Sequence, residues 1–423
     1  MKQKNIFVYV MGLPPGAVSS IRKYEKAVRK KFRIMLIMDS RTKHKREATD
    51  YTGLDILLYV DFSRPGQIAQ VLLPYQEQLL AITCRTESHM LKFMQVIPHV
   101  PYLRTPTTES LEWSTDKLKM RRRFILYNKK ITPKFCLIKG NTKTERAKAK
   151  KKIGFPMIVK PTNLAQSMLV TICYHEEDLE KSLRSTFRKI KKIYEENKRD
   201  EQPQVVVEEY MEGDMYSIDG YVNSRGTVYF CPMVKVVTGK NIGHDDFYNY
   251  LHLTPTAFKK STIERAERVA EMGVHALGLR NTTVHVELMK IDDEWKIVEI
   301  GPRVGGFRVK LHELSCGIDH SLNDLLIRVP KQPVIPKKCS GFAAALKWYP
   351  KKEGIITKLK GIKKCQKLAS FVEISVNKKV GDRCHFAKNG GKAVFVITLH
   401  NYERSKLLAD IRRVEQLIDI KIK

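Results

Sequence analysis

A stretch from residue 284 to 306, VHVELMKIDDEWKIVEIGPRVGG, carries the side chains best suited to chemistry. Apolar residues alternate on both sides of a short acidic run, which predicts two strands joined by a tight turn. If the turn is a three-residue loop, Ile291 pairs with Trp295 and Glu287 stands opposite Glu299, whereas a two-residue loop would offset the pair by one. Like charges face to face destabilise a sheet unless they share a proton or a cation.

Arg303 and two glycines, Gly305 and Gly306, follow Glu299 closely. A fixed guanidinium and exposed backbone beside paired carboxylates are what phosphoryl transfer from a nucleotide requires, because the carboxylates can hold a divalent metal. The alternative is a hairpin whose glutamates simply face solvent. The clustered Arg-x-Gly-Gly favours a site.

The net charge of the 423-residue chain is unusual. It has 77 lysines and arginines against 45 aspartates and glutamates, which gives a formal charge of +32. Such a field attracts polyanions, so nucleic acid is a candidate partner, although a solvated lysine surface explains the charge equally well. The basic residues are densest from residue 117 to 152, where few aromatic residues could stack on single-stranded nucleic acid.

The eight cysteines are scattered, with no C-x-x-C pair and no cysteine–histidine spacing typical of zinc. They indicate buried thiols in a reducing compartment. The apolar run near the N-terminus is broken by the sequence GLPPG at residues 12–16, so we do not expect a signal peptide. No stretch approaches the roughly 18 apolar residues of a membrane-spanning helix. We therefore expect a cytoplasmic protein without a membrane partner.

Apolar strand-like runs alternate with helical patterns up to about residue 100, which predicts a small doubly wound parallel sheet. A proline-rich linker follows at residues 98–106. Beyond Pro330 the pattern changes to short strands divided by glycine- and lysine-rich turns, with one helix at 402–418. We expect an α+β segment there, so the fold class is α/β and α+β.

Three further motifs precede the glutamate hairpin in order: Asp116-Lys117 ahead of Thr132-Pro133, the strand FPMIVKP from Phe155 to Pro161, and VVVEEYM from Val205 to Met211. A lysine that leaves an apolar strand, as Lys160 does, is placed for an anion, although either lysine alone could be an ordinary surface residue.

Together these motifs resemble the ATP-grasp superfamily, and within it the carboxylate–amine ligase branch that includes L-amino-acid ligases and carnosine-synthase-like enzymes. The resemblance covers nearly the whole chain. It implies an ATP-grasp fold with an N-terminal doubly wound pre-ATP-grasp domain (1–100), a nucleotide-binding region (101–330, with a lid subdomain at about 130–207) and a small C-terminal sheet subdomain (331–423).

The resemblance also implies roles for single residues. The residues expected on the nucleotide are Lys117, Lys160, Ser167, Glu208, Glu209, Tyr210, Met211 and Asp219. Glu287 and Glu299 are expected to bind Mg²⁺ or Mn²⁺, and Glu299 and Arg303 to be catalytic. Gly305, Gly306 and His244 are expected near the substrate, while His285 is expected to be structural.

The sequence departs from the family pattern at three points. Met215 stands where a glutamate is usual, although Asp214 could substitute for it. Gly301 replaces the asparagine of the metal motif. The loop at 162–169 contains none of the glycines whose N–H groups usually cover the phosphates.

The activity implied by the resemblance is that of an ATP-dependent ligase. A substrate carboxylate would attack the γ-phosphate to give an acylphosphate and ADP, and an amine would then displace phosphate to form an amide or peptide bond. The expected substrates are small carboxylates and amines, such as amino acids, and a homodimer is common in the family. The alternatives are other acylphosphate chemistry, of the carboxylase or purine-pathway type, and a basic nucleic-acid-binding protein that has lost turnover.

Overall fold

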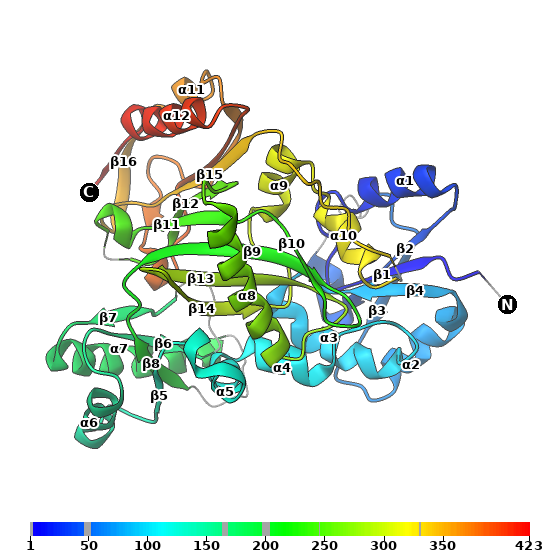
Figure 1. Cartoon of the computed structure of the whole chain (residues 1–423), viewed down its shortest axis with the longest axis horizontal. Helices are drawn as coiled ribbons and strands as arrows, with labels where there is room; N and C mark the ends of the chain where they lie inside the picture. Colours follow the sequence, from blue (N-terminus) through cyan, green and yellow to red (C-terminus); the bar gives the residue numbers. More distant parts are fainter. Residues whose placement is uncertain (1–2, 46–51, 163–167, 197–203, 245, 330) are drawn as a thin grey trace.

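The computed structural model describes residues 3–45, 52–162, 168–196, 204–244, 246–329 and 331–423. Three parts follow one another along the chain: an N-terminal parallel sheet, a small antiparallel lid sheet and a large antiparallel sheet (Figure 1). The lid sheet lies beside one end of the large sheet, and the N-terminal sheet lies toward the other end. We call the large one the central sheet.

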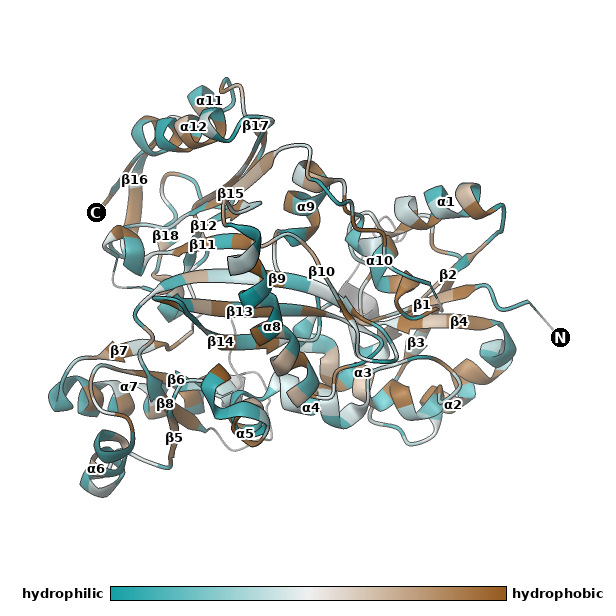
Figure 2. Ribbon diagram, viewed as in Figure 1, coloured by the Kyte–Doolittle hydropathy of each residue, from teal (hydrophilic) through white to brown (hydrophobic). Residues whose placement is uncertain are grey.

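The N-terminal sheet has the strand order β3-β2-β1-β4, and all its pairs are parallel. Both faces are covered, because alternate residues of β1 belong to different apolar clusters on the two sides. Figure 2 shows these strands as predominantly hydrophobic, as expected for a parallel sheet buried on both faces. The predicted doubly wound domain is confirmed. Its elements are β1 (Ile6–Val10), α1 (Ala17–Val28), β2 (Arg33–Asp39), β3 (Ile56–Val60), α2 (Gln67–Leu72), β4 (Leu79–Thr83) and α3 (Met90–Val96).

Two consecutive helices, α4 (Thr108–Thr115) and α5 (Lys117–Asn128), lead from this sheet to the lid. Asp116 is the N-cap of α5, and its side chain accepts a hydrogen bond from the backbone N–H of Lys119. The cap ends α4 and starts α5 at one residue, so Lys117 occupies the first position of a helix.

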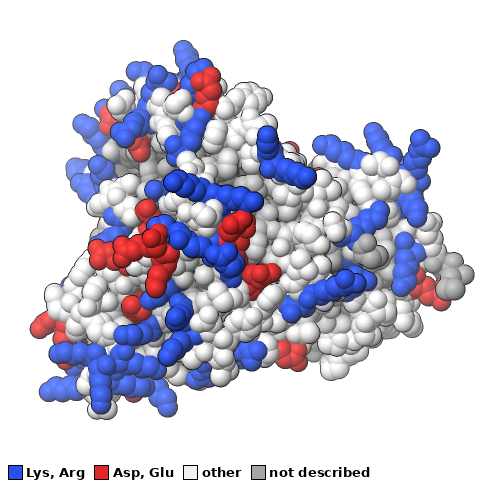
Figure 3. Space-filling view, in the orientation of Figure 1, with Lys and Arg blue, Asp and Glu red and all other residues white. Residues whose placement is uncertain are grey.

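The lid sheet has the order β5-β8-β6-β7, and its pairs are antiparallel. Two helices cover it, and α6 is largely hydrophilic in Figure 2. Exposed lysines of α6 form part of the crowd of basic side chains at the lower left of Figure 3. The lid elements are β5 (Phe135–Ile138), α6 (Lys143–Lys152), β6 (Met157–Pro161), β7 (Thr171–Cys173), α7 (Glu176–Glu196) and β8 (Val205–Glu209).

The central sheet runs β14-β13-β9-β11-β12-β15-β19-β17, and β10 also pairs with β9. Helix α8 packs on β14 and β13 along its apolar face. Gly273 of α8 allows this close approach, because a Cβ there would lie 2.3 Å from Cδ1 of Ile297. The elements before the C-terminal segment are β9 (Asp214–Val222), β10 (Val228–Phe230), β11 (Val234–Thr238), β12 (Asn249–Thr254), α8 (Lys260–Ala276), β13 (Thr282–Ile291), β14 (Glu294–Gly301), α9 (Arg308–Cys316) and α10 (His320–Leu326).

The C-terminal segment is shared between two sheets. The expected small sheet is present with the order β18-β16-β20, but β15, β19 and β17 extend the central sheet through the pairing of β12 with β15. Helix α12 packs against β19 and β15. The elements are β15 (Phe342–Trp348), β16 (Gly354–Lys360), α11 (Ile362–Cys365), β17 (Phe371–Val376), β18 (Arg383–Cys384), β19 (Phe395–Asn401), α12 (Arg404–Leu417) and β20 (Asp419–Ile422).

Two of the eight cysteines do not match the expectation of buried free thiols. Cys316 and Cys339 form a disulfide with an S–S distance of 2.09 Å, because the end of α9 meets the segment that leads into β15. The other six cysteines are buried and free. Among the described residues, none of the helices combines the length and the apolar character needed to cross a membrane.

Candidate active site

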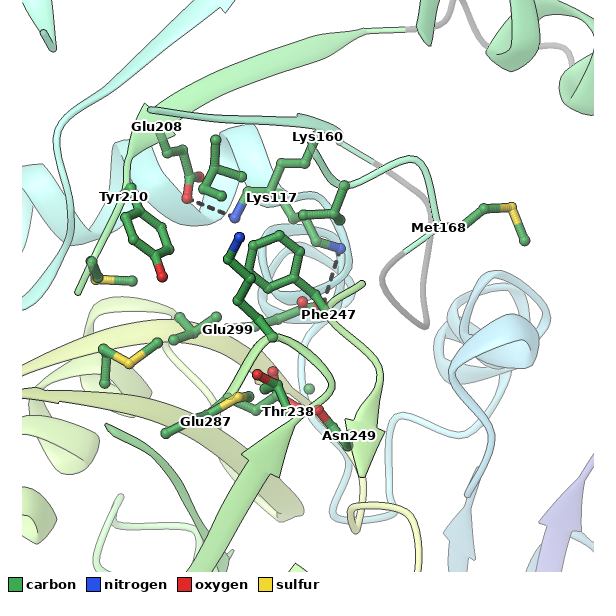
Figure 4. A pocket seen from close by; sticks show the side chains of 18 of the residues that line it. Lys117, Lys160, Met168, Glu208, Tyr210, Thr238, Phe247, Asn249, Glu287 and Glu299 are labelled. Atoms are coloured by element: carbon green, nitrogen blue, oxygen red, sulfur yellow. Dashed lines mark ion pairs between the residues drawn. The ribbon is translucent and has the colours of Figure 1, made fainter. Parts of the chain in front are cut away.

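A cavity of about 250 Å³ lies between the lid sheet and the central sheet (Figure 4). Strands β6 and β8 border it on the lid side, and β9, β13 and β14 border it on the other side. Nine of the residues singled out from the sequence line it: Lys117, Lys160, Glu208, Glu209, Tyr210, Met211, Glu287, Glu299 and Arg303.

The two hairpin glutamates face each other, but not for the reason that the sequence suggested. The turn has two residues rather than three, since Ile291 pairs with Glu294 and the backbone of Asp292 is left-handed (φ 49°). The shorter turn would leave Glu287 one residue out of register with Glu299. A β-bulge removes this offset, because Leu288 pairs with Ile297 while Glu287 pairs with Glu299. The extra residue in the bulge is Val298. The assumed loop length is therefore wrong, and the predicted carboxylate pair is confirmed.

Lys117 lies beside this pair. Its ammonium nitrogen is 3.2 Å from Oε1 of Glu299, and its side chain is largely buried. Burial opposes the charge, but the carboxylates of Glu299 and Glu87 outweigh it and raise the Lys117 pKa. The lysine is therefore a permanent cation next to the glutamates at neutral pH.

Glu208 lines the cavity, and its carboxylate forms ion pairs with two cations. Arg121 of α5 donates to both carboxylate oxygens, at 2.8 and 3.0 Å, and Lys160 of β6 lies 2.7 Å from Oε2 (Figure 4 shows the lysine pair). Arg121 also donates to the backbone oxygens of Ile297 and Val298 in β14. One guanidinium thus joins α5, the lid sheet and the bulged strand of the hairpin.

The charges in this cluster are coupled. Burial opposes ionisation of Glu208, but Arg121 and Lys160 overcome it and lower the Glu208 pKa to about 2. Burial also lowers the Lys160 pKa to about 8, although Glu208 pulls it in the other direction. Glu208 is an anion at neutral pH, and Lys160 is a cation that begins to lose its proton just above it.

Arg303 forms an ion pair with Glu87, which comes from the N-terminal part of the chain. Nε of Arg303 is 3.0 Å from Oε2 of Glu87, and its Nη2 contacts the same oxygen. Sequence reasoning missed Glu87. Its signal is position: it follows β4 at the carboxyl end of a parallel strand, where α/β sheets gather ligand-binding residues.

Asp219 lies behind the glutamate pair and not among the described residues that line the cavity. Its buried carboxylate accepts hydrogen bonds from Nδ1 of His285 (3.1 Å) and from the backbone N–H of Gly305 (2.7 Å). The other ring nitrogen of His285 is 3.4 Å from Glu287. Burial disfavours the charged imidazole, but Asp219 raises the His285 pKa, and His285 in turn lowers the pKa of Glu287. Asp219 therefore acts on Glu287 through His285.

Four other predicted residues, Ser167, His244, Gly305 and Gly306, lie outside the described chain or do not line the cavity. Ser167 is outside the described residues. His244 does not line the cavity, and its Nδ1 is 2.7 Å from the Tyr248 hydroxyl. Phe247 of the same loop and Asn249, the first residue of β12, do line it. Gly306 follows Gly305 just beyond the lining residues.

Arg121 is the other residue that sequence reasoning missed. It stands in a run of three arginines, and nothing local distinguishes the buried one from its exposed neighbour Arg122. Its available signal is the four-residue spacing from Lys117, which puts both side chains on one face of α5.

Comparison with known proteins agrees with this geometry. A family model described as an ATP-grasp domain matches residues 153–310, which include β6, β8 and the whole hairpin. Alanine–anticapsin ligases of Bacillus amyloliquefaciens and Bacillus subtilis (strain 168) are 25% and 24% identical over 220 residues, or 49% of this chain and 45% of each relative. The match thus spans a little under half the length of these relatives.

Solved structures match over nearly the whole chain. An L-amino acid ligase from Bacillus licheniformis superposes with a TM-score of 0.77 at 15% identity, covering 100% of both chains. The chain has an ATP-grasp fold, and residues 153–310 match the ATP-grasp domain model. A phosphoribosylglycinamide synthetase from Anaerococcus prevotii has the same ATP-grasp fold, with a TM-score of 0.65 at 20% identity over 100% of both chains. The predicted resemblance to ATP-grasp proteins of the carboxylate–amine ligase branch is confirmed.

Removing the Glu208 charge should destabilise the contact between the lid sheet and the central sheet. Glu208→Gln leaves two buried cations without a carboxylate, and we expect it to lower the free energy of unfolding by about 3–5 kcal/mol. Glu209→Gln is the matched control, because Glu209 is partly exposed and its ion pair with Lys296 is 3.3 Å long; it should cost about 1 kcal/mol or less. Urea unfolding measures both, and equal losses would contradict the assignment.

The difference in unfolding free energy between wild type and Glu208→Gln should depend on pH. The folded pKa of Glu208 is lowered from 4.5 to about 2, so its stabilising charge is fully present above pH 4.5 and is lost as the pH falls toward 2. The difference between wild type and Glu208→Gln should therefore shrink over that interval.

Proposed function

We propose that the protein is an ATP-dependent carboxylate–amine ligase that forms an amide or peptide bond through an acylphosphate and releases ADP and phosphate. The observation that carries the proposal is the facing pair Glu287 and Glu299, set in a cavity with Lys160 on its lid side and Arg303 beside the pair. Anion-binding cations and paired carboxylates in one cavity suit a nucleotide triphosphate.

The nucleotide would occupy the lid side of the cavity. Lys117 and Lys160 would bind its phosphates, and the segment from Glu208 to Met211 would border the adenine as it leaves β8. Ile158, Met211 and Met289 give this part of the cavity apolar walls, as a flat base requires. Ser167, which lies outside the described residues, is proposed as a further phosphate contact from the sequence resemblance alone.

The glutamate pair fits a hard divalent cation. Carboxylate oxygens are the ligands that Mg²⁺ and Mn²⁺ prefer, and His285 orients one of the two carboxylates from behind. Glu287 and Glu299 would hold the cation, with Asp219 supporting His285. When bound, the cation would offset the charge that develops on the phosphates.

Arg303 would hold the transferred phosphoryl group and the substrate carboxylate that attacks it. Its ion pair with Glu87 keeps a carboxylate close by, and this carboxylate would attract the incoming amine. The substrate carboxylate itself would attack the γ-phosphate, so the step requires no nucleophile from the protein. Gly305, Gly306 and His244 would shape the substrate end through backbone and loop contacts.

Substrate dependence tests the proposal directly. Phosphate release from Mg-ATP is measured across a matrix of amino acids, small amines and bicarbonate. We expect release only with particular acid–amine pairs, and a loss of roughly 100-fold or more in Glu299→Gln. Glu294→Gln, at the exposed turn of the same hairpin, should keep full activity. Release with bicarbonate alone would favour carboxylase-type chemistry instead.

A protein that binds nucleic acid but not ATP would support the rival reading of the +32 charge. Its binding should weaken steeply with salt, because the released counterions dominate such binding.

Lys160 should make ATP binding depend on pH. Its folded pKa is about 8, so its positive charge is present below that value and is lost as the pH rises through it. ATP affinity should then fall by up to about tenfold per pH unit above pH 8. Lys160→Arg should remove this dependence, because a guanidinium stays charged.

Lys117→Arg is the control: the pKa of Lys117 is raised, so its replacement should leave the wild-type profile. Calorimetric titrations across this range decide the matter, and an unchanged profile in Lys160→Arg would refute the assignment.

Gly301 offers a gain-of-function test of the metal site. A Cβ at this position would meet its nearest neighbour at 3.7 Å, so a side chain fits without displacing backbone. Gly301→Asn should add an oxygen ligand and lower the Mg²⁺ concentration needed for half-maximal activity by roughly tenfold, about 1.4 kcal/mol. Gly140→Asn, in open space on the lid, is the matched control. A half-maximal concentration that stays unchanged in Gly301→Asn would place the metal elsewhere.

A further inference from the structure

A second group of potential metal ligands lies outside the cavity. Cys231 follows β10, His312 belongs to α9, and His320 opens α10. The sulfur and one nitrogen from each ring all lie within 4.8 Å of one another. The side chains are almost fully buried, with 3%, 0% and 0% exposure. Sequence spacing gives no hint of this group, because Cys231 and the two histidines come from separate segments.

Each histidine is oriented by an oxygen on the ring nitrogen that points away from the group. Nε2 of His312 donates to the carbonyl oxygen of Pro232 at 3.0 Å, which leaves its Nδ1 with a lone pair. Nδ1 of His320 lies 2.6 Å from the Tyr221 hydroxyl, so its Nε2 faces His312. An oxygen partner on the outer nitrogen is the usual support of a metal-binding histidine.

The protonation states also suit a metal. Burial lowers the His312 pKa to about 4 and the His320 pKa well below its ordinary value, so both rings are neutral at pH 7. Burial raises the pKa of the Cys231 thiol, because an isolated thiolate would be unsolvated there. A bound divalent cation would supply the missing charge, and the thiol proton would leave to solvent as the Sγ–metal bond forms.

The inner nitrogens, Nδ1 of His312 and Nε2 of His320, are 2.8 Å apart. Two nitrogens on one tetrahedral zinc, with bonds of about 2.0–2.1 Å, stand roughly 3.3 Å apart, so the two rings need to separate by only a few tenths of an ångström to hold the ion. The Cys231 sulfur, within 4.8 Å of both nitrogens, would move in to complete the set. A direct hydrogen bond between the rings also fits this distance, and Cys231 would then remain hydrogen-bonded to Tyr221, so a measurement of metal content must decide between the two arrangements.

We propose that Cys231, His312 and His320 form a zinc site, with a water molecule in the fourth tetrahedral position. The ion would tie the segment after β10 to the corner between α9 and α10. That corner contacts the N-terminal sheet. Asp324 of α10 accepts a hydrogen bond from Thr83 at 2.6 Å, and Arg85 donates to the backbone oxygen of His320. The site would therefore stabilise the joint on which Glu87 depends.

Metal content of the full chain tests the proposal. Protein expressed with zinc and dialysed against EDTA is analysed by inductively coupled plasma mass spectrometry. We expect about one zinc per chain in wild type, and less than about a tenth of that in Cys231→Ser, His312→Gln and His320→Gln. Cys384→Ser and His400→Gln, which alter a buried cysteine and a histidine outside the group, should keep the zinc.

Cobalt substitution covers the case in which the variants fail to fold. Wild-type protein stripped with a strong chelator and reloaded with Co²⁺ should show a thiolate-to-cobalt charge-transfer band, which Co²⁺ on Glu287 and Glu299 cannot produce. Zinc should restore the unfolding temperature of the stripped protein. The absence of both bound zinc and the thiolate band in wild type would overturn the proposal and leave a hydrogen-bonded histidine pair.

Discussion

The carboxylate of Glu208, buried between Arg121 and Lys160, joins the parts that form the cavity. Burying two cations around a single carboxylate is costly. The cost is offset here because both oxygens of Glu208 accept charge-assisted hydrogen bonds. Arg121 extends the same network to the backbone of β14. Lys160 of the lid is thereby joined through Glu208 and Arg121 to the hairpin that carries Glu287 and Glu299.

In the hairpin, the pairing of Glu287 with Glu299 was predicted correctly, although the length of the turn was not. The periodicity of Val284, Val286 and Leu288 identifies the strand, since one face of a strand repeats every second residue. Loop length was one residue shorter than assumed, and the bulge at Val298 compensates for it. A bulge is decided by packing on neighbouring strands rather than by its own sequence, so it could not have been predicted.

The site also depends on a part of the chain far from the family motifs. Glu87 reaches Arg303 from the end of β4, and α10 packs its leucines on the N-terminal sheet. The C-terminal strands, which we expected in a small separate sheet, mostly extend the central one. The large sheet and the cavity therefore depend on both ends of the chain, and basic side chains are spread over the face of the molecule in Figure 3.

The sequence by itself determined the order of most strands and helices and the doubly wound N-terminal sheet. It also identified Lys117, Lys160, the segment from Glu208 to Met211 and the two glutamates of the hairpin, all of which line the cavity. These depend on local periodicity and on motifs whose residues stand close together in the chain. Only the tertiary structure decided which partners these residues have. Arg121 meets Glu208 across 87 residues and Arg303 meets Glu87 across 216. Pairs so distant in the chain leave no periodic signal, because their contact is created by the packing of whole sheets.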